Sequence, residues 1–153
     1  MKFIKYLKKR GVFICYDTNI RPYTIKKHKN EVKSRVFRLL NEADLAKLSE
    51  IDLDYLTGQK SPLKALKTLK NRVKSELVLT LGPKGSIYCY QSDTVCRRRR
   101  HTVSDVIKVP AFKVKIADTI GAGDAFTAGL IYKLIKQGRA KFFNNMRANM
   151  IFA

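Results

Sequence analysis

Nine consecutive residues, Asp118 to Phe126, combine a glycine turn with a carboxylate. They read Asp-Thr-Ile-Gly-Ala-Gly-Asp-Ala-Phe, so two glycines stand two residues apart and Asp124 follows the second directly. Behind them, apolar residues recur every four positions from Phe126 to Leu134, which is typical of an amphipathic helix. We therefore expect the turn to lie at a helix N-terminus, where free amides and the helix dipole attract an anion.

A carboxylate beside an anion-binding turn suggests phosphoryl transfer. The turn Gly121, Ala122 and Gly123 would hold the migrating phosphoryl group, and Asp124 would take the proton from the attacking hydroxyl as general base. The alternative is structural, because an aspartate before a helix commonly caps it and a glycine there commonly makes a turn. The stretch is neither a P-loop, since no Gly-Lys-Ser/Thr follows, nor the dinucleotide fingerprint, since Phe126 occupies the third glycine position.

The stretch from Asp118 to Phe126 resembles the C-terminal signature of the ribokinase-like, or phosphofructokinase-B (PfkB), carbohydrate kinases. Three further segments resemble motifs of that family, in the family's order and in the form found in bacterial fructokinases. They are Asp17-Thr-Asn-Ile-Arg-Pro22, the segment from Ala43 to Asp52, and Thr80-Leu-Gly-Pro-Lys-Gly85. Together with the glycine turn, these matches run from about residue 11 to the end of the sequence.

The resemblance implies roles at the catalytic centre and at the nucleotide. It makes Asp124 the catalytic base and Gly121, Ala122 and Gly123 the anion hole. The residues that it places at the nucleotide are Thr80, Gly82, Lys84, Gly85 and Asn149. From the residues alone, Asn149 is equally well interpreted as a surface residue.

The resemblance also implies contacts with substrate and with metal ions. Asn19 and Arg21 would contact substrate or phosphate, although a turn asparagine and a surface arginine explain them equally well. Glu50 and Asp52 would act on Mg²⁺ through water, as hard oxygen ligands do. Asp118 and the backbone of Ile120 would bind a monovalent cation, with K⁺ the candidate; the alternative for Asp118 is a turn residue.

Strand and helix patterns alternate along the chain, which predicts an α/β fold with a mainly parallel sheet. We expect strands over residues 12–16, 43–47, 76–81, 86–90, 103–109 and 110–116. We expect helices over residues 3–7, 31–40, 50–58, 63–73, 125–136 and 140–153. Ser49 is expected to cap the third of these helices, with Asp52 completing a capping box. The resemblance implies the three-layer α/β/α fold of the ribokinase-like kinases.

The resemblance also bears on how much of a kinase this sequence represents. Ribokinase-like kinases are considerably longer, and their N-terminal half carries the sugar-binding residues, part of the sheet and the lid. We therefore expect residues 1–153 to be a C-terminal portion of such a domain, with impaired activity alone. The expected partners are a small-molecule sugar and ATP, with either a dimer or a complementary N-terminal half.

The composition is strongly basic, with 32 Lys and Arg against 12 Asp and Glu and a net charge of +20. The densest run is Arg97 to Arg100, which we interpret as a solvated loop because no aromatic residues interleave it for stacking on bases. Nucleic acid is therefore not the expected partner. A non-catalytic basic module that binds nucleic acid or an acidic partner is the alternative to a kinase, and tight, steeply salt-dependent oligonucleotide binding would support it.

Hydropathy and cysteine usage limit the class of protein further. Hydrophobic residues make up 45% of the chain, enough for a globular core. No apolar run reaches the ~18 residues of a membrane span, and the basic N-terminus lacks the apolar stretch of a signal peptide. The three cysteines form no Cys-x-x-Cys pair, which disfavours a zinc site and predicts reduced thiols in the cytoplasm.

Overall fold

A five-stranded sheet forms the centre of the molecule, with strand order β1-β2-β3-β4-β5. The structure, a computed structural model, describes residues 2–25, 28–90, 106–113, 115 and 118–152. The strands are β1 (Cys15–Asp17), β2 (Leu45–Ser49), β3 (Glu76–Thr80), β4 (Ser86–Cys89) and β5 (Val106–Val109). The first three are parallel, β4 is antiparallel to β3, and β5 is antiparallel to β4. Only β4 therefore runs against the others, and the expectation of a mainly parallel sheet is confirmed.

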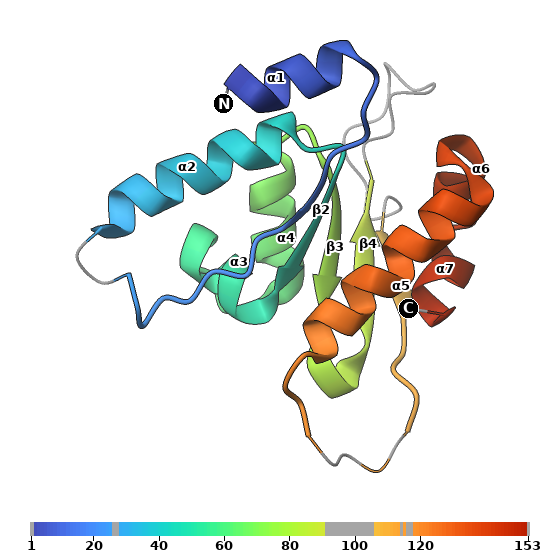
Figure 1. Cartoon of the computed structure of the whole chain (residues 1–153). Helices are drawn as coiled ribbons and strands as arrows, with labels where there is room; N and C mark the ends of the chain where they lie inside the picture. Colours follow the sequence, from blue (N-terminus) through green and yellow to red (C-terminus); the bar gives the residue numbers. More distant parts are fainter. Residues whose placement is uncertain (1, 26–27, 91–105, 114, 116–117, 153) are drawn as a thin grey trace, which may run out of the picture.

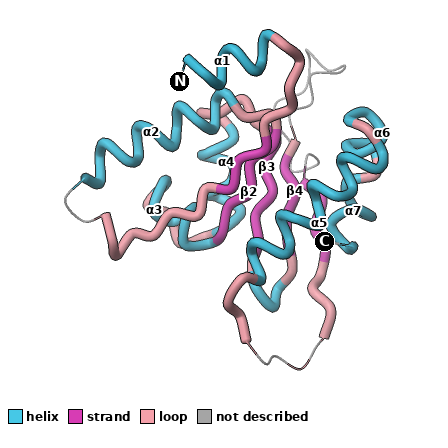
Figure 2. The backbone as a smooth tube through the Cα atoms, in the orientation of Figure 1, coloured by secondary structure: helices cyan, strands magenta, loops and turns pink. Residues whose placement is uncertain are grey.

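Helices cover both faces of this sheet (Figures 1 and 2). One layer contains α2 (Lys29–Glu42), α3 (Glu50–Thr57) and α4 (Pro62–Lys70); the other contains α5 (Ala122–Gln137), α6 (Arg139–Asn144) and α7 (Met146–Phe152). The short helix α1 (Lys2–Lys9) has no buried residue. The predicted three-layer α/β/α architecture is thus present.

The strands contribute side chains to two separate cores, because successive side chains point to opposite faces of the sheet. In β2 and β3, Ala46, Leu48, Leu77 and Leu79 pack in the core with α2, α3 and α4. Leu45 and Val78 point the other way and pack in the core that contains Leu130, Phe142 and Met146 of the second layer. Near-continuous apolar strands such as β2 and β3 follow from burial on both faces.

Local signals fix both ends of α3. Ser49 is its N-cap and accepts a hydrogen bond from the Asp52 amide, and the Asp52 side chain accepts one from the Ser49 amide, so the predicted capping box is confirmed. Gly58 ends the helix with φ 71°, a left-handed conformation that glycine adopts without a steric penalty.

Several predicted elements differ from the structure. The strand predicted over 43–47 is Leu45–Ser49, and the helix predicted over 63–73 is Pro62–Lys70. The strand predicted over residues 12–16 begins only at Cys15. The Val12 amide instead donates a hydrogen bond to the Leu7 carbonyl in the turn after α1. Residues 110–113 form no strand, since Pro110 has no N–H for a ladder and Phe112 is 71% exposed. The single helix predicted for 140–153 is two helices, separated at Asn145, whose ψ of 23° leaves the helical range. The predictions for residues 97–100, 103–105, 114 and 116 lie outside the described residues.

Candidate active site

Three of the four sequence motifs lie at the carboxyl ends of the parallel strands. Asp17 ends β1, Ser49 ends β2 and Thr80 ends β3. Register places Asp17 opposite Lys47 and Ser49 opposite Thr80, and the Thr80 hydroxyl donates to the Leu48 carbonyl at 3.2 Å. This edge is where open α/β sheets bind their ligands.

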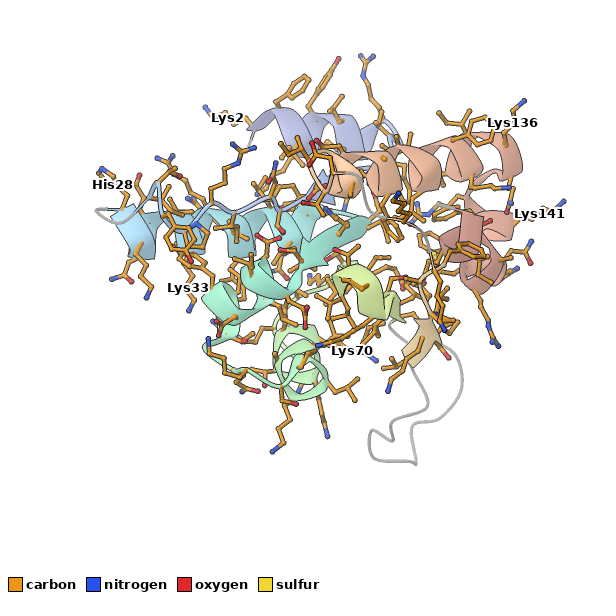
Figure 3. The ribbon with its side chains drawn as sticks, turned by 90° about the horizontal axis from the view of Figure 1, so that it is seen from below. Lys2, His28, Lys33, Lys70, Lys136 and Lys141 are labelled. Atoms are coloured by element: carbon orange, nitrogen blue, oxygen red, sulfur yellow. The ribbon has the colours of Figure 1, made fainter. Side chains whose placement is uncertain are left out.

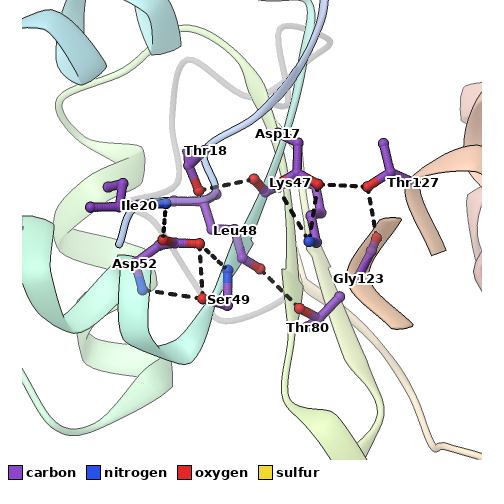
Figure 4. Close-up of polar contacts among 10 residues, drawn as sticks. All are labelled: Asp17, Thr18, Ile20, Lys47, Leu48, Ser49, Asp52, Thr80, Gly123 and Thr127. Atoms are coloured by element: carbon purple, nitrogen blue, oxygen red, sulfur yellow. Dashed lines mark hydrogen bonds and ion pairs between the residues drawn. The ribbon is translucent and has the colours of Figure 1, made fainter. Parts of the chain in front are cut away.

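Asp52 joins the second motif to the first. Its side chain is buried, with the residue 2% exposed, and Oδ1 accepts a hydrogen bond from the Ile20 amide at 2.7 Å. Oδ2 accepts from the amide and the hydroxyl of Ser49, each at 2.8 Å (Figure 4). The loop that carries Asn19 and Arg21 is thereby fixed to the start of α3. Both of those residues are exposed, and Asn19 has φ 36°, a left-handed conformation that asparagine tolerates better than most side chains.

Replacing Asp52 with alanine is expected to lower the free energy of unfolding by about 3 kcal/mol, because the buried Ile20 amide and the part-buried amide and hydroxyl of Ser49 lose their acceptor. Urea unfolding measures this change. The control is Asp54→Ala on the same helix, where a partly exposed carboxylate pairs with the exposed Lys60 and about 0.5 kcal/mol is expected. Equal losses in the two variants would contradict the joining role of Asp52.

Of the two carboxylates near the start of α3 that are predicted to contact Mg²⁺ through water, only one is accessible. Glu50 is half-buried and lines an open pocket of about 280 Å³ together with Tyr23 and Lys60. Asp52 accepts three hydrogen bonds and is almost inaccessible. No three His, Cys, Asp or Glu side chains lie close enough to hold a metal ion among the described residues. The carboxylate that fits a contact with a metal-bound water is therefore that of Glu50.

The glycine turn lies at the N-terminus of α5, as its sequence predicts. Gly121 is the N-cap with φ 76°, and Ala122, Gly123 and Asp124 form the first turn. The Ala122 amide donates to the Thr119 carbonyl at 3.3 Å, and the amides of Gly123 and Asp124 have no intrahelical acceptor. Asp124 is exposed, and its carboxylate accepts no hydrogen bond from the part of the chain that the structure describes. The hydrogen-bonded capping role considered for Asp124 is therefore absent, and its carboxylate is accessible beside the turn.

An ion pair between a buried lysine and a half-buried aspartate connects this turn to the sheet. The Lys47 ammonium lies 3.1 Å from Oδ2 of Asp17, with the Lys47 side chain 8% exposed and that of Asp17 20% exposed. The Thr127 hydroxyl donates to the same Asp17 oxygen at 2.8 Å and lies 3.0 Å from the Gly123 carbonyl oxygen. We call Asp17, Lys47 and Thr127 the latch. As Figure 4 shows, it links β1 and β2 to the first turn of α5.

Sequence reasoning missed the latch as a functional set. Asp17 and Lys47 stood inside motif segments but received no role, and Thr127 was passed over. One signal was available: Lys47 is the only charged residue in the strand Leu45–Ser49, and a charge in a buried strand requires a buried counter-charge. Spacing could not identify the partner, because Asp17 lies 30 residues from Lys47 along the chain, and Thr127 lies 110 residues from Asp17.

Burial, and then the negative charge at this edge, raises the pKa values of two neighbouring side chains on β1. Burial raises the pKa of the Tyr16 phenol, with further contributions from the carboxylates of Asp52 and Asp17. Burial, and then Asp17, also raises the pKa of the Cys15 thiol. Both groups are therefore neutral at physiological pH and add no charge to the site.

Asp118 and Ile120 lie before the turn and are both exposed. Oδ1 of Asp118 accepts hydrogen bonds from the amides of Thr119 and Ile120, at 2.6 and 2.9 Å. This is the geometry of the turn residue considered as the alternative for Asp118. It leaves the other carboxylate oxygen available, so the monovalent-cation role stays a prediction.

The predicted nucleotide residues lie on two different sides of the sheet. Gly82, Lys84 and Gly85 belong to the turn between β3 and β4, and Lys84 lines an open pocket of about 420 Å³ with Ile87 of the α2–α4 core. Asn149 lies in the α5–α7 layer, 1% exposed, where it donates to the Phe142 carbonyl and exchanges hydrogen bonds with Gln137. The surface alternative for Asn149 is wrong, and its nucleotide role stays a prediction.

Basic side chains are distributed around the molecule. The lysines labelled in Figure 3, among them Lys2, Lys33, Lys70 and Lys136, lie on different sides of it. Such a distribution gives a general positive potential. Among the described residues, no helix combines the length and the apolar character that crossing a bilayer requires.

A family model described as pfkB family carbohydrate kinase matches residues 1–141. The chain belongs to this family. Fructokinase-1 of Zea mays is 31% identical to the chain over 138 residues, which are 89% of this chain and 38% of the plant protein. An ATP-dependent 6-phosphofructokinase of Thermoanaerobacterium thermosaccharolyticum is 31% identical over 129 residues, 84% of this chain and 36% of that protein. The chain thus spans less than half the length of these pfkB relatives.

Solved structures show the same fold. Aminoimidazole riboside kinase from Salmonella enterica superposes with a TM-score of 0.79 at 21% identity, covering 97% of this chain and 47% of the other. Fructokinase from Vibrio cholerae O395, in its fructose, ADP and calcium ion bound form, gives 0.77 at 28% identity, covering 96% and 44%. The ribokinase-like fold inferred for this pfkB chain is thereby confirmed.

Proposed function

We propose that this chain carries the phosphoryl-transfer part of an ATP-dependent sugar kinase of the fructokinase type. The observation that carries the proposal is the exposed Asp124 beside the Gly121–Gly123 turn, at the sheet edge where the other motif segments meet. Membership of the pfkB family and similarity to fructokinases support it.

In this proposal each part of the edge has a separate task. The first-turn amides of α5 stabilise the charge of the transferring group, and the Asp124 carboxylate accepts the proton of the sugar hydroxyl. Asn19 and Arg21, held by the bond between Ile20 and Asp52, contact substrate or phosphate. Mg²⁺ would neutralise phosphate charge when bound, with Glu50 holding one of its waters.

The remaining contacts are proposed for nucleotide and cation. Thr80, Gly82, Lys84 and Gly85 contact ATP, with Asn149 supporting the same site from the α5–α7 layer. Asp118 and the Ile120 backbone bind K⁺. The sugar-binding and lid residues come from the part of a pfkB domain that this chain does not span, given that it covers 38% of the maize fructokinase.

A coupled kinase assay tests the function. The purified chain is given ATP, Mg²⁺ and fructose, ribose or 2-keto-3-deoxygluconate, alone and mixed with the separately expressed N-terminal portion of a related fructokinase. We expect little turnover alone and fructose phosphorylation in the mixture. No phosphorylation of any sugar in the mixture would contradict the kinase assignment, and robust turnover by the chain alone would contradict its dependence on a second portion.

A further inference from the structure

The Lys47 ammonium packs directly against Gly123. A Cβ built on Gly123 would lie 2.8 Å from Nζ of Lys47 and 3.9 Å from its Cε. Because the Lys47 side chain is only 8% exposed and paired with Asp17, its end cannot simply swing into solvent. A side chain at position 123 would therefore have to displace the Lys47 ammonium from its ion pair with Asp17.

Asp17 and Thr127 determine where that cation lies. The Thr127 hydroxyl has one hydrogen, which goes to the carboxylate of Asp17 as the stronger acceptor. Thr127 lies on α5, four residues after Gly123. Asp17 therefore binds both the Lys47 ammonium and, through Thr127, the helix that packs against this ammonium. The latch thereby sets the position of the first turn relative to β1 and β2.

The positively charged end of the latch faces the turn. Lys47 and Asp17 neutralise each other, but the ammonium end is the one that lies against Gly123. A positive charge at a helix N-terminus opposes the helix dipole, unless an anion occupies that end. This arrangement is unfavourable for the empty turn and favourable for the turn with phosphate bound.

We propose that Lys47 is a positioning residue for the anion-binding turn, held by Asp17 and Thr127, and that it raises the affinity of the turn for the phosphates of a nucleotide. The inference rests on the proposed function, because it assumes that the turn binds phosphate. It adds a charged residue beneath the turn, and it gives a physical reason for glycine at position 123.

A double-mutant cycle on the full chain tests the proposal, with ADP and adenosine affinities measured by calorimetry. Lys47→Ala and Gly123→Ala are each expected to weaken ADP binding about tenfold, and the second change is expected to add less than about twofold once Lys47 is absent. Adenosine binding should be unchanged in all variants, which a merely structural role of Lys47 would not produce. Additive losses, or equal losses for adenosine, would overturn the proposal.

Two variants of Thr127 test the latch without changing a residue of the turn itself. Thr127→Ser keeps the hydroxyl and should retain ADP affinity. Thr127→Val keeps the shape but loses the hydrogen bond that positions Asp17, and should weaken ADP binding about fivefold. If Thr127→Ser weakened ADP binding more than Thr127→Val, the packing of the methyl group would matter and the hydroxyl would not. That result would contradict the proposal. If the unmodified chain binds no ADP, the proposed function fails first; if it binds ADP with additive mutant effects, only the positioning role fails.

Discussion

Replacing Asp124 with asparagine is expected to lower sugar phosphorylation about a thousandfold, within the range that a positioned general base contributes. The carboxylate is exposed beside the turn and accepts no hydrogen bond from the described residues, so its removal leaves no buried group unsatisfied. The loss should appear in kcat, measured with the chain and its complementing portion together. The free energy of unfolding and the affinity for ADP should change little.

The control for this change is Glu31→Gln, an exposed carboxylate of α2 that pairs with Arg35. Its activity should equal that of the unmodified chain. A loss of only a few-fold for Asp124→Asn, accompanied by a lower free energy of unfolding, would show that Asp124 merely stabilises the start of α5 through the helix dipole.

Replacing Gly85 with alanine is expected to destabilise the chain by about 4 kcal/mol or more, enough to unfold much of it. A Cβ on Gly85 would lie 2.0 Å from the Val109 carbonyl oxygen and 2.8 Å from the Ala111 nitrogen, both of which are backbone atoms. Its φ of 94° adds strain for any L side chain. Thermal and urea unfolding measure the loss directly.

Gly58→Ala provides the comparison for Gly85→Ala. Gly58 also has a positive φ, 71°, but a Cβ there would meet nothing within 4 Å. About 1 kcal/mol is expected from the left-handed conformation alone. Similar losses at the two positions would mean that the turn between β3 and β4 can move away from β5, and the proposed nucleotide loop would then be mobile.

Local chemistry made part of the site predictable. The capping box of Ser49 and Asp52 and the glycine turn before α5 follow from residues within a few positions of each other, so the sequence carries the whole signal. The bond from the Ile20 amide to Asp52 and the latch could not be predicted in the same way. They join residues brought together only by the order of strands in the sheet.

The errors in the fold have a similar origin. Alternation over residues 110–116 predicts a half-buried strand, but alternation does not reveal that Pro110 ends the ladder at Val109. The helical pattern after residue 140 is real, but it does not show the break at Asn145 between α6 and α7. Asn149 likewise gives no sign in the sequence that its amide lies buried between Phe142 and Gln137.

The most direct test of the site is a titration of the ¹⁵N-labelled chain with ADP, followed by NMR. If the first turn of α5 cradles phosphate, the amide resonances of Gly121 to Asp124 should shift most, and titration with adenosine should leave them in place. Shifts confined to other residues, or identical shifts with adenosine, would contradict an anion-binding turn beside Asp124.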